Sequence, residues 1–91
     1  MLLTKNSEIL KEKISKAIEN FNQIRSPEAV AELVKIKDSN FLIKFSGHMC
    51  YTCGVYDYFE DLVYELEDLG VKSKIKDYKR FNNYFLVEYK I

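Results

Sequence analysis

Apolar residues recur at helical spacing in two segments of the chain. Residues 7–24 and residues 55–69 each carry an apolar stripe at steps of three and four, with polar residues on the opposite side. This pattern predicts two amphipathic helices. Ser7 is the candidate N-cap of the first helix, and Gly70 suits the left-handed position after the second. The expected stripes are Leu10, Ile14, Ala17, Ile18, Phe21 and Ile24, and Val55, Phe59, Leu62, Val63, Leu66 and Leu69.

Between the two expected helices, the apolar period changes from helical to alternating. Phe41, Ile43 and Phe45 alternate with less apolar neighbours, which is typical of a half-buried strand. Val34 and Ile36 also alternate with lysines, and the turn-forming residues 38–40 follow. The pattern favours a β-hairpin over roughly residues 29–46. The alternative is a short helix over residues 27–33, because Ser26-Pro27 is a typical helix start.

A second hairpin is expected near the end of the chain. Residues 71–78 and 84–91 alternate apolar and polar side chains, and residues 79–83 form the connecting turn. The element order is therefore α-β-β-α-β-β. We predict an α+β fold, a two-layer sandwich with both helices on one face of a mostly antiparallel four-stranded sheet.

The length and amino-acid composition limit the classes of protein to which the chain can belong. The 91 residues fit one domain, spanning residues 1–91. A hydrophobic content of 47% is enough for a packed core. No apolar run approaches the roughly 20 residues of a membrane span, and the first residues do not resemble a secretory signal. These features predict a cytoplasmic protein with no membrane partner.

Candidate chemistry is concentrated in the motif Cys50-Tyr51-Thr52-Cys53. The motif lies between an expected strand and an expected helix. Unpaired N–H groups and the helix dipole stabilise a thiolate at a helix N-terminus and lower its pKa. A second thiol one turn away can then resolve a mixed disulfide. We therefore assign Cys50 as the attacking sulfur, Cys53 as the resolving sulfur, and His48 as a nearby charge; no cofactor is required.

Two other readings of the cysteines stay open. His48, Cys50 and Cys53 form an H-x-C-x-x-C run, but a closed zinc site needs four ligands and the chain has no second C-x-x-C. The cysteines can also be structural, as small buried side chains or a static disulfide. No metal site is therefore assigned.

The cysteine segment resembles two groups of known proteins. Over residues 41–69 it is locally similar to the strand, C-x-x-C and helix of thioredoxins, but no proline follows Pro27 and the further β-α unit is missing. Over residues 45–62 it resembles a family of short archaeal proteins of unknown function with a C-x-T-C-G motif. That resemblance implies the α-β-β-α-β-β fold and an archaeal source, and it implies no activity. Frequent Lys and Glu with a single Gln are also typical of thermophiles.

A non-enzymatic alternative comes from the strands. Lysines on the phase opposite to the core would form a basic sheet face with an apolar and aromatic centre. A net charge of zero argues against non-specific nucleic-acid binding, but it leaves such a local face open. The partner would be RNA, an acidic protein or a second copy of the chain; the opposite reading is a solvated face whose lysines prevent aggregation. The candidate binding residues are Lys44, Lys72, Lys74, Lys76, Tyr84 and Leu86.

Overall fold

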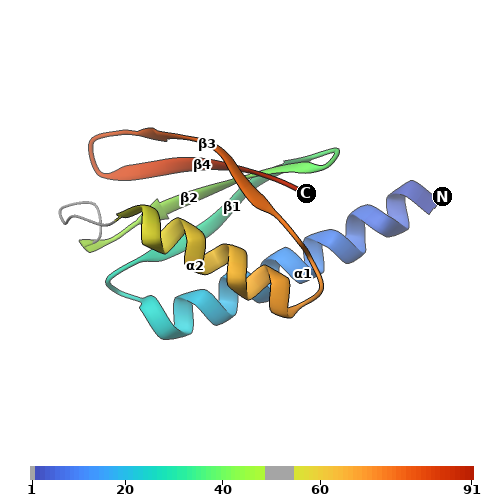
Figure 1. Cartoon of the computed structure of the whole chain (residues 1–91), viewed down its shortest axis with the longest axis horizontal. Helices are drawn as coiled ribbons and strands as arrows, with labels where there is room; N and C mark the ends of the chain where they lie inside the picture. Colours follow the sequence, from blue (N-terminus) through green and yellow to red (C-terminus); the bar gives the residue numbers. More distant parts are fainter. Residues whose placement is uncertain (1, 49–54) are drawn as a thin grey trace.

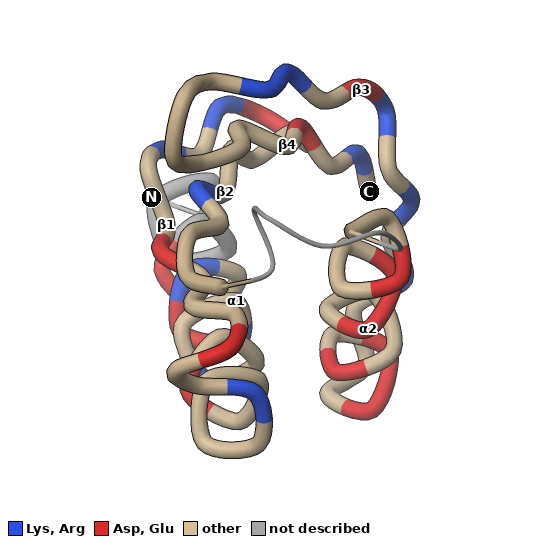
Figure 2. Tube along the Cα trace, turned by 90° about the vertical axis from the view of Figure 1, so that its left-hand side faces the viewer, with Lys and Arg blue, Asp and Glu red and all other residues tan. Residues whose placement is uncertain are grey.

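The chain folds into two layers, a sheet and a pair of helices. The computed structural model describes residues 2–48 and 55–91. Both helices lie on one side of the sheet, and no described element covers the other side (Figure 1; Figure 2). The elements in chain order are α1 (Leu2–Arg25), β1 (Val30–Lys37), β2 (Asn40–Ser46), α2 (Val55–Asp68), β3 (Lys74–Arg80) and β4 (Tyr84–Lys90).

The four strands form one antiparallel sheet in the order β1-β2-β4-β3. The two sequential hairpins therefore meet through β2 and β4 at the centre. This arrangement confirms the predicted α+β fold and the predicted order of elements. It also decides between the alternatives for residues 27–33, because β1 begins at Val30 and no helix forms there.

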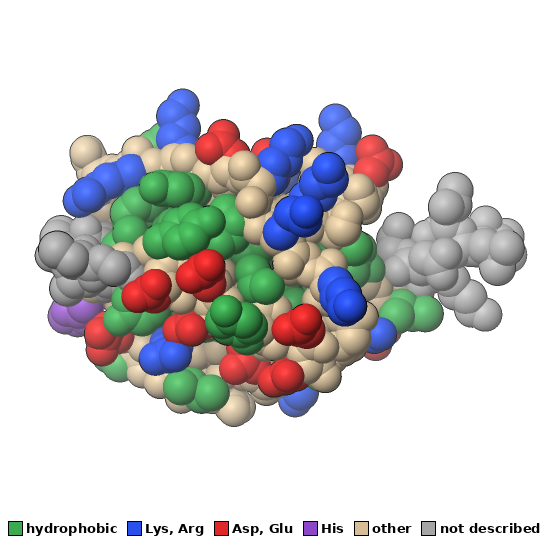
Figure 3. Space-filling model, viewed as in Figure 1, with side chains coloured by type: hydrophobic (Ala, Val, Ile, Leu, Met, Phe, Trp, Pro, Cys, Tyr) green, Lys and Arg blue, Asp and Glu red, His purple; other side chains and the backbone are tan. Residues whose placement is uncertain are grey.

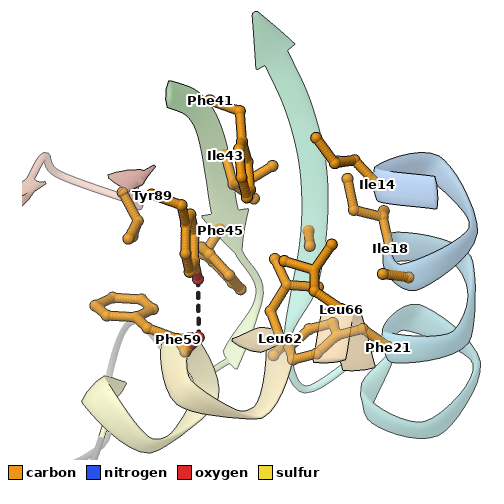
Figure 4. Packing of buried hydrophobic residues seen from close by; sticks show 14 of the residues in the cluster. Ile14, Ile18, Phe21, Phe41, Ile43, Phe45, Phe59, Leu62, Leu66 and Tyr89 are labelled. Carbon is orange, nitrogen blue, oxygen red and sulfur yellow. Dashed lines mark hydrogen bonds between the residues drawn. The ribbon is translucent and has the colours of Figure 1, made fainter. Parts of the chain in front are cut away.

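The core lies between the sheet and the helices. Along β2 and β4, alternate residues are fully buried and face each other as cross-strand pairs. These pairs are Phe41–Tyr89, Ile43–Val87 and Phe45–Phe85. Both helices pack on this layer through the expected stripes, which include Ile14, Phe21, Phe59, Leu62 and Leu66 (Figure 4).

Each edge strand contains an irregularity that alternation alone does not predict. In β1 the register shifts between Leu33 and Lys35, so Leu33 and Ile36 face the core while Val34 is 48% exposed. The alternation of Val34 and Ile36 with lysines had predicted that Val34 faces the core, and this prediction is wrong. A β-bulge inserts one extra residue and reverses the side that each later residue faces.

The bulge in β3 has a larger consequence. The register shifts between Ile75 and Asp77, leaving Lys76 as the extra residue. Tyr78 and Arg80 then share the inner side with their partners on β4, and Lys79 turns to the outer side. The strand starts at Lys74 instead of residue 71 and ends at Arg80. The turn is therefore shorter than expected.

The helices differ from expectation mainly at the ends of α1. The helix begins at Leu2, so Ser7 is not its N-cap; residues 2–6 contain no Gly or Pro to interrupt it. Ile24 is 67% exposed, because nothing in the described part of the chain covers it. Helix α2 ends as predicted. Gly70 has a φ of 87°, and the N–H groups of Gly70 and Val71 bond to the last turn.

One polar group crosses the core. The Tyr89 hydroxyl donates a hydrogen bond of 2.9 Å to the Phe59 carbonyl oxygen, which joins β4 directly to α2 (Figure 4). Tyr89 is fully buried. Burial disfavours the phenolate and raises the pKa of Tyr89 well above its ordinary value of 10.0.

This burial predicts a specific pH dependence of stability. In the unfolded chain Tyr89 ionises near pH 10.0, whereas in the folded chain it keeps its proton. The folded state then binds more protons above that pH, so its stability falls as pH rises. Replacing Tyr89 by Phe should cost about 1 kcal/mol at neutral pH through the lost hydrogen bond. Above pH 10 the wild type should lose about 1.4 kcal/mol per pH unit relative to Tyr89→Phe, so the cost of the substitution should vanish within about one pH unit and then reverse.

Urea titrations at a series of pH values measure both effects. Tyr64→Phe is the matched control, since it also removes one phenol but at a side chain that is 60% exposed. A Tyr89→Phe variant whose free energy of unfolding runs parallel to wild type through the alkaline range would contradict the prediction.

Candidate functional site

The open face of the sheet brings together most of the side chains predicted to bind a partner. Residues opposite in phase to the buried pairs point away from the helices. Lys44 pairs with Leu86 across β2 and β4, and Ser46 pairs with Tyr84. Across β3 and β4, Lys79 pairs with Leu86 and Lys74 pairs with Lys90. We call this surface the open sheet face.

Lysines outnumber acids on the open sheet face. Glu88 lies among them, but its carboxylate accepts a hydrogen bond from Asn40 at 3.1 Å and lies 3.7 Å from the Lys76 ammonium. These contacts also show that Lys76 reaches this face from the bulge. The charged residues are Lys35, Lys37, Lys44, Lys74, Lys76, Lys79 and Lys90 against Glu32, Asp77 and Glu88.

Apolar and aromatic groups also lie on the open sheet face. Leu42 and Leu86 are half-buried there, and Tyr84 is half-buried at the end of the face where β4 begins. The Tyr84 ring stacks on Phe81 with centroids 4.8 Å apart and an interplanar angle of 12°. The Lys44 ammonium lies 4.9 Å from the Tyr84 centroid, within the range of a cation–π interaction.

The structure places the six predicted binding residues unevenly. Lys44, Lys74, Tyr84 and Leu86 lie on the open sheet face, and Lys76 reaches it from the bulge. Lys72 is exposed but precedes β3, so it does not belong to a strand.

Sequence reasoning missed two members of the face, Lys79 and Phe81. Both had been assigned to a turn. The bulge at Lys76 brings Lys79 to the outer side, and the Phe81 N–H bonds to the Tyr84 carbonyl at the hairpin end. The only sequence signal is the aromatic pair flanking Asn82-Asn83, which fits a tight hairpin connection.

The other layer carries the acidic residues of α2. All charged side chains of α2 are acidic, and they follow its solvent side. Figure 2 shows acidic positions along α2 and basic positions along β3 and the end of β4. Figure 3 shows hydrophobic side chains between an upper edge with several Lys and Arg side chains and a lower region rich in Asp and Glu, with some charges of the opposite sign in both. Two exposed tyrosines, Tyr56 and Tyr78, have ring centroids 5.9 Å apart between α2 and β3.

The predicted thiol site lies mostly outside the described residues. Cys50 and Cys53 fall within residues 49–54, which the structure does not describe, and His48 is exposed. The flanking elements are described: β2 ends at Ser46 and α2 begins at Val55. The motif therefore connects a strand to a helix in the chain, as the sequence predicted.

A set of contacts fixes the end of β2 and the start of α2, which flank residues 49–54. The Tyr58 hydroxyl on α2 donates a 2.6 Å hydrogen bond to Glu28, and Arg25 forms a 2.6 Å ion pair with Asp61. The hydrogen bond to Glu28, followed by partial burial, raises the pKa of Tyr58 above 10.0. At the other end, Gly47 has a φ of 108° and approaches the Pro27–Glu28 backbone closely.

Residues 2–48 and 55–91 contain no group of three or more His, Cys, Asp or Glu side chains placed to hold a metal. Within the same residues, neither helix is both long enough and apolar enough to cross a membrane.

Comparison with known proteins adds no functional assignment. The sequence matches no protein-family model, and no curated protein matches it. The resemblance of residues 45–62 to short archaeal proteins, and the archaeal source it implies, therefore stay predictions.

The close approach at Gly47 predicts an intolerant position. A Cβ on Gly47 would lie 2.8 Å from the carbonyl oxygens of both Pro27 and Glu28. Gly47→Ala should therefore lose about 1–3 kcal/mol from the positive φ and a further amount from this overlap. Gly70→Ala is the matched control, because Gly70 shares a positive φ but has only the flexible Lys13 ammonium nearby, at 3.7 Å. Equal losses in chemical denaturation would contradict a role for the close contact.

Proposed function

We propose that this protein is a binding module for a polyanion, held on the open sheet face. The observation that supports the proposal is the placement of the helices. Because both cover the same face, the opposite face is left for solvent or a partner (Figure 2). That face carries the lysines around the half-buried side chains of Leu42, Leu86 and Tyr84.

Segregated charge makes this binding compatible with zero net charge. The chain has 14 basic and 14 acidic side chains. The acids of α2 lie in the helical layer, whereas the lysines of β2, β3 and β4 lie in the sheet layer. A polyanion approaching the molecule is repelled from α2 and attracted to the sheet, so the field also orients the encounter.

The open sheet face has too few acidic residues for each of its lysines to have an acidic partner within the protein. Among the described residues, Glu88 has contacts with Asn40 and Lys76, Asp77 lies opposite Glu88, and Glu32 lies opposite Lys44 in the ladder. Lys74 instead faces Lys90 across β3 and β4, which places like charges opposite each other. Such a pair is unfavourable in the free protein. An anion bound between the two would relieve this repulsion.

Heparin, a sulfated polyanion without bases, provides the test of this function. We expect the protein to bind labelled heparin at low salt and to lose affinity steeply as salt rises. Replacing Lys74 and Lys79 by Gln should weaken binding and make it less dependent on salt. For phosphate strands, each lost contact lowers the log–log slope by about 0.7–0.9, and we expect a similar decrease here. Fluorescence anisotropy across a salt series measures the slope.

A second lysine pair controls for the change in net charge. Lys11→Gln with Lys16→Gln removes the same charge from exposed positions of α1 in the other layer. This variant should bind heparin nearly as wild type does. Equal weakening by both double variants, or no wild-type binding at low salt, would refute the proposal.

Thiol–disulfide chemistry at Cys50 and Cys53 is the second candidate function. It is supported by the bounds of β2 and α2, because the motif immediately precedes the N-terminus of a helix in the chain. We expect Cys50 in a Cys53→Ser variant to be alkylated with a midpoint near neutral pH. We also expect mild oxidant to join the two cysteines in the wild type. Alkylation only above about pH 8 would indicate ordinary thiols, and protection that a chelator removes would indicate a metal site.

A further inference from the structure

The end of the open sheet face has a feature that lysines alone do not explain. Phe81 and Tyr84 form a stacked pair at the β3–β4 turn, and both rings are partly exposed. A lysine ammonium lies against each ring: Lys44 is 4.9 Å from the Tyr84 centroid and Lys79 is 5.9 Å from the Phe81 centroid. Two cations and two aromatic rings thus form one continuous group.

A shallow depression adjoins this group. Its volume is about 720 Å³, and it is lined by the turn residues Arg80, Phe81, Asn82, Asn83 and Tyr84. The lining combines aromatic rings with an arginine and side-chain amides, which can donate and accept hydrogen bonds. A planar group with polar edges therefore fits the chemistry of this depression better than a purely aliphatic one.

We infer that the polyanion is a single-stranded nucleic acid, with a base stacked at the Phe81–Tyr84 pair and phosphates held by Lys44 and Lys79. This inference rests on the proposed polyanion-binding function and identifies its ligand class. Phosphate attracts a lysine ammonium more strongly than a ring face does, since the interaction is between full charges. Binding of phosphate would therefore draw the lysines from the rings and free ring surface for stacking.

The aromatic pair distinguishes this ligand from other polyanions. A duplex keeps its bases stacked inside and would offer only its phosphates to the lysines. An acidic peptide would also pair with the lysines, but its carboxylates have no planar ring to place on Phe81 or Tyr84. Combined lysine and aromatic contacts are instead the usual means of binding single strands, where each base presents a π-face.

A tryptophan at position 81 can report stacking directly, because the chain contains no natural Trp. We expect the fluorescence of Phe81→Trp to be quenched by 12-residue oligouridylate or oligothymidylate. Heparin, a duplex of the same length and polyglutamate should quench it little. Comparing the two oligonucleotides shows whether the 2′-hydroxyl contributes.

Affinity measurements on ring-deleted variants complete the test. Phe81→Leu with Tyr84→Leu should weaken oligonucleotide binding about 10-fold or more, a much larger factor than its effect on heparin binding. Tyr84→Phe, which keeps the ring, should bind as wild type does, and Tyr64→Leu controls for loss of an exposed aromatic in the other layer. Thermal melts confirm that each variant is folded.

Three results would overturn the inference. They are heparin binding without oligonucleotide quenching, equal loss of both ligands in the ring-deleted variant, and tighter binding of polyglutamate than of either oligonucleotide. In each case the lysine-dependent binding of heparin would still support the polyanion module. The proposed function itself would be refuted by the two results given for it above, which are failure of heparin to bind the wild type and equal weakening by the two lysine double variants.

Discussion

The pairing of β2 with β4 determines both the core and the candidate binding face. The pairs Phe41–Tyr89, Ile43–Val87 and Phe45–Phe85 bury one side of the sheet. Because strand side chains alternate, the same register sends Lys44, Tyr84 and Leu86 to the other side. A slip of one residue would exchange the two sets, so the hydrophobic core enforces the positions of the β2 and β4 side chains on the open sheet face.

The Tyr89–Phe59 hydrogen bond connects this central pair to α2. It fixes the helix close to the sheet at one point, while Arg25–Asp61 and Tyr58–Glu28 fix it against the region where α1 turns into β1. Gly47 brings the end of β2 against the same region. The strand and helix that flank the cysteine motif are therefore held to one shared support.

The two candidate functions depend on different residues. The lysines and rings belong to the open sheet face, whereas the cysteine motif connects β2 to α2. Substitutions on the face at Lys74, Lys79 or Phe81 are thus distant in the chain from Cys50 and Cys53. The two functions can be tested separately. Zero net charge, a property of the whole chain, hides the separation of lysines in the sheet from acids in α2.

The sequence alone determined the element order, the two-layer architecture and most of the core, since apolar periods of 3.6 and 2 are imposed by burial. It also identified Lys44, Lys74, Lys76, Tyr84 and Leu86 as members of one face. It could not place Val34, Lys79 or Phe81, because a bulge leaves no mark in the residue pattern. Only the tertiary structure decided these positions, through the pairing of each edge strand with its neighbour and the stacking of Phe81 on Tyr84.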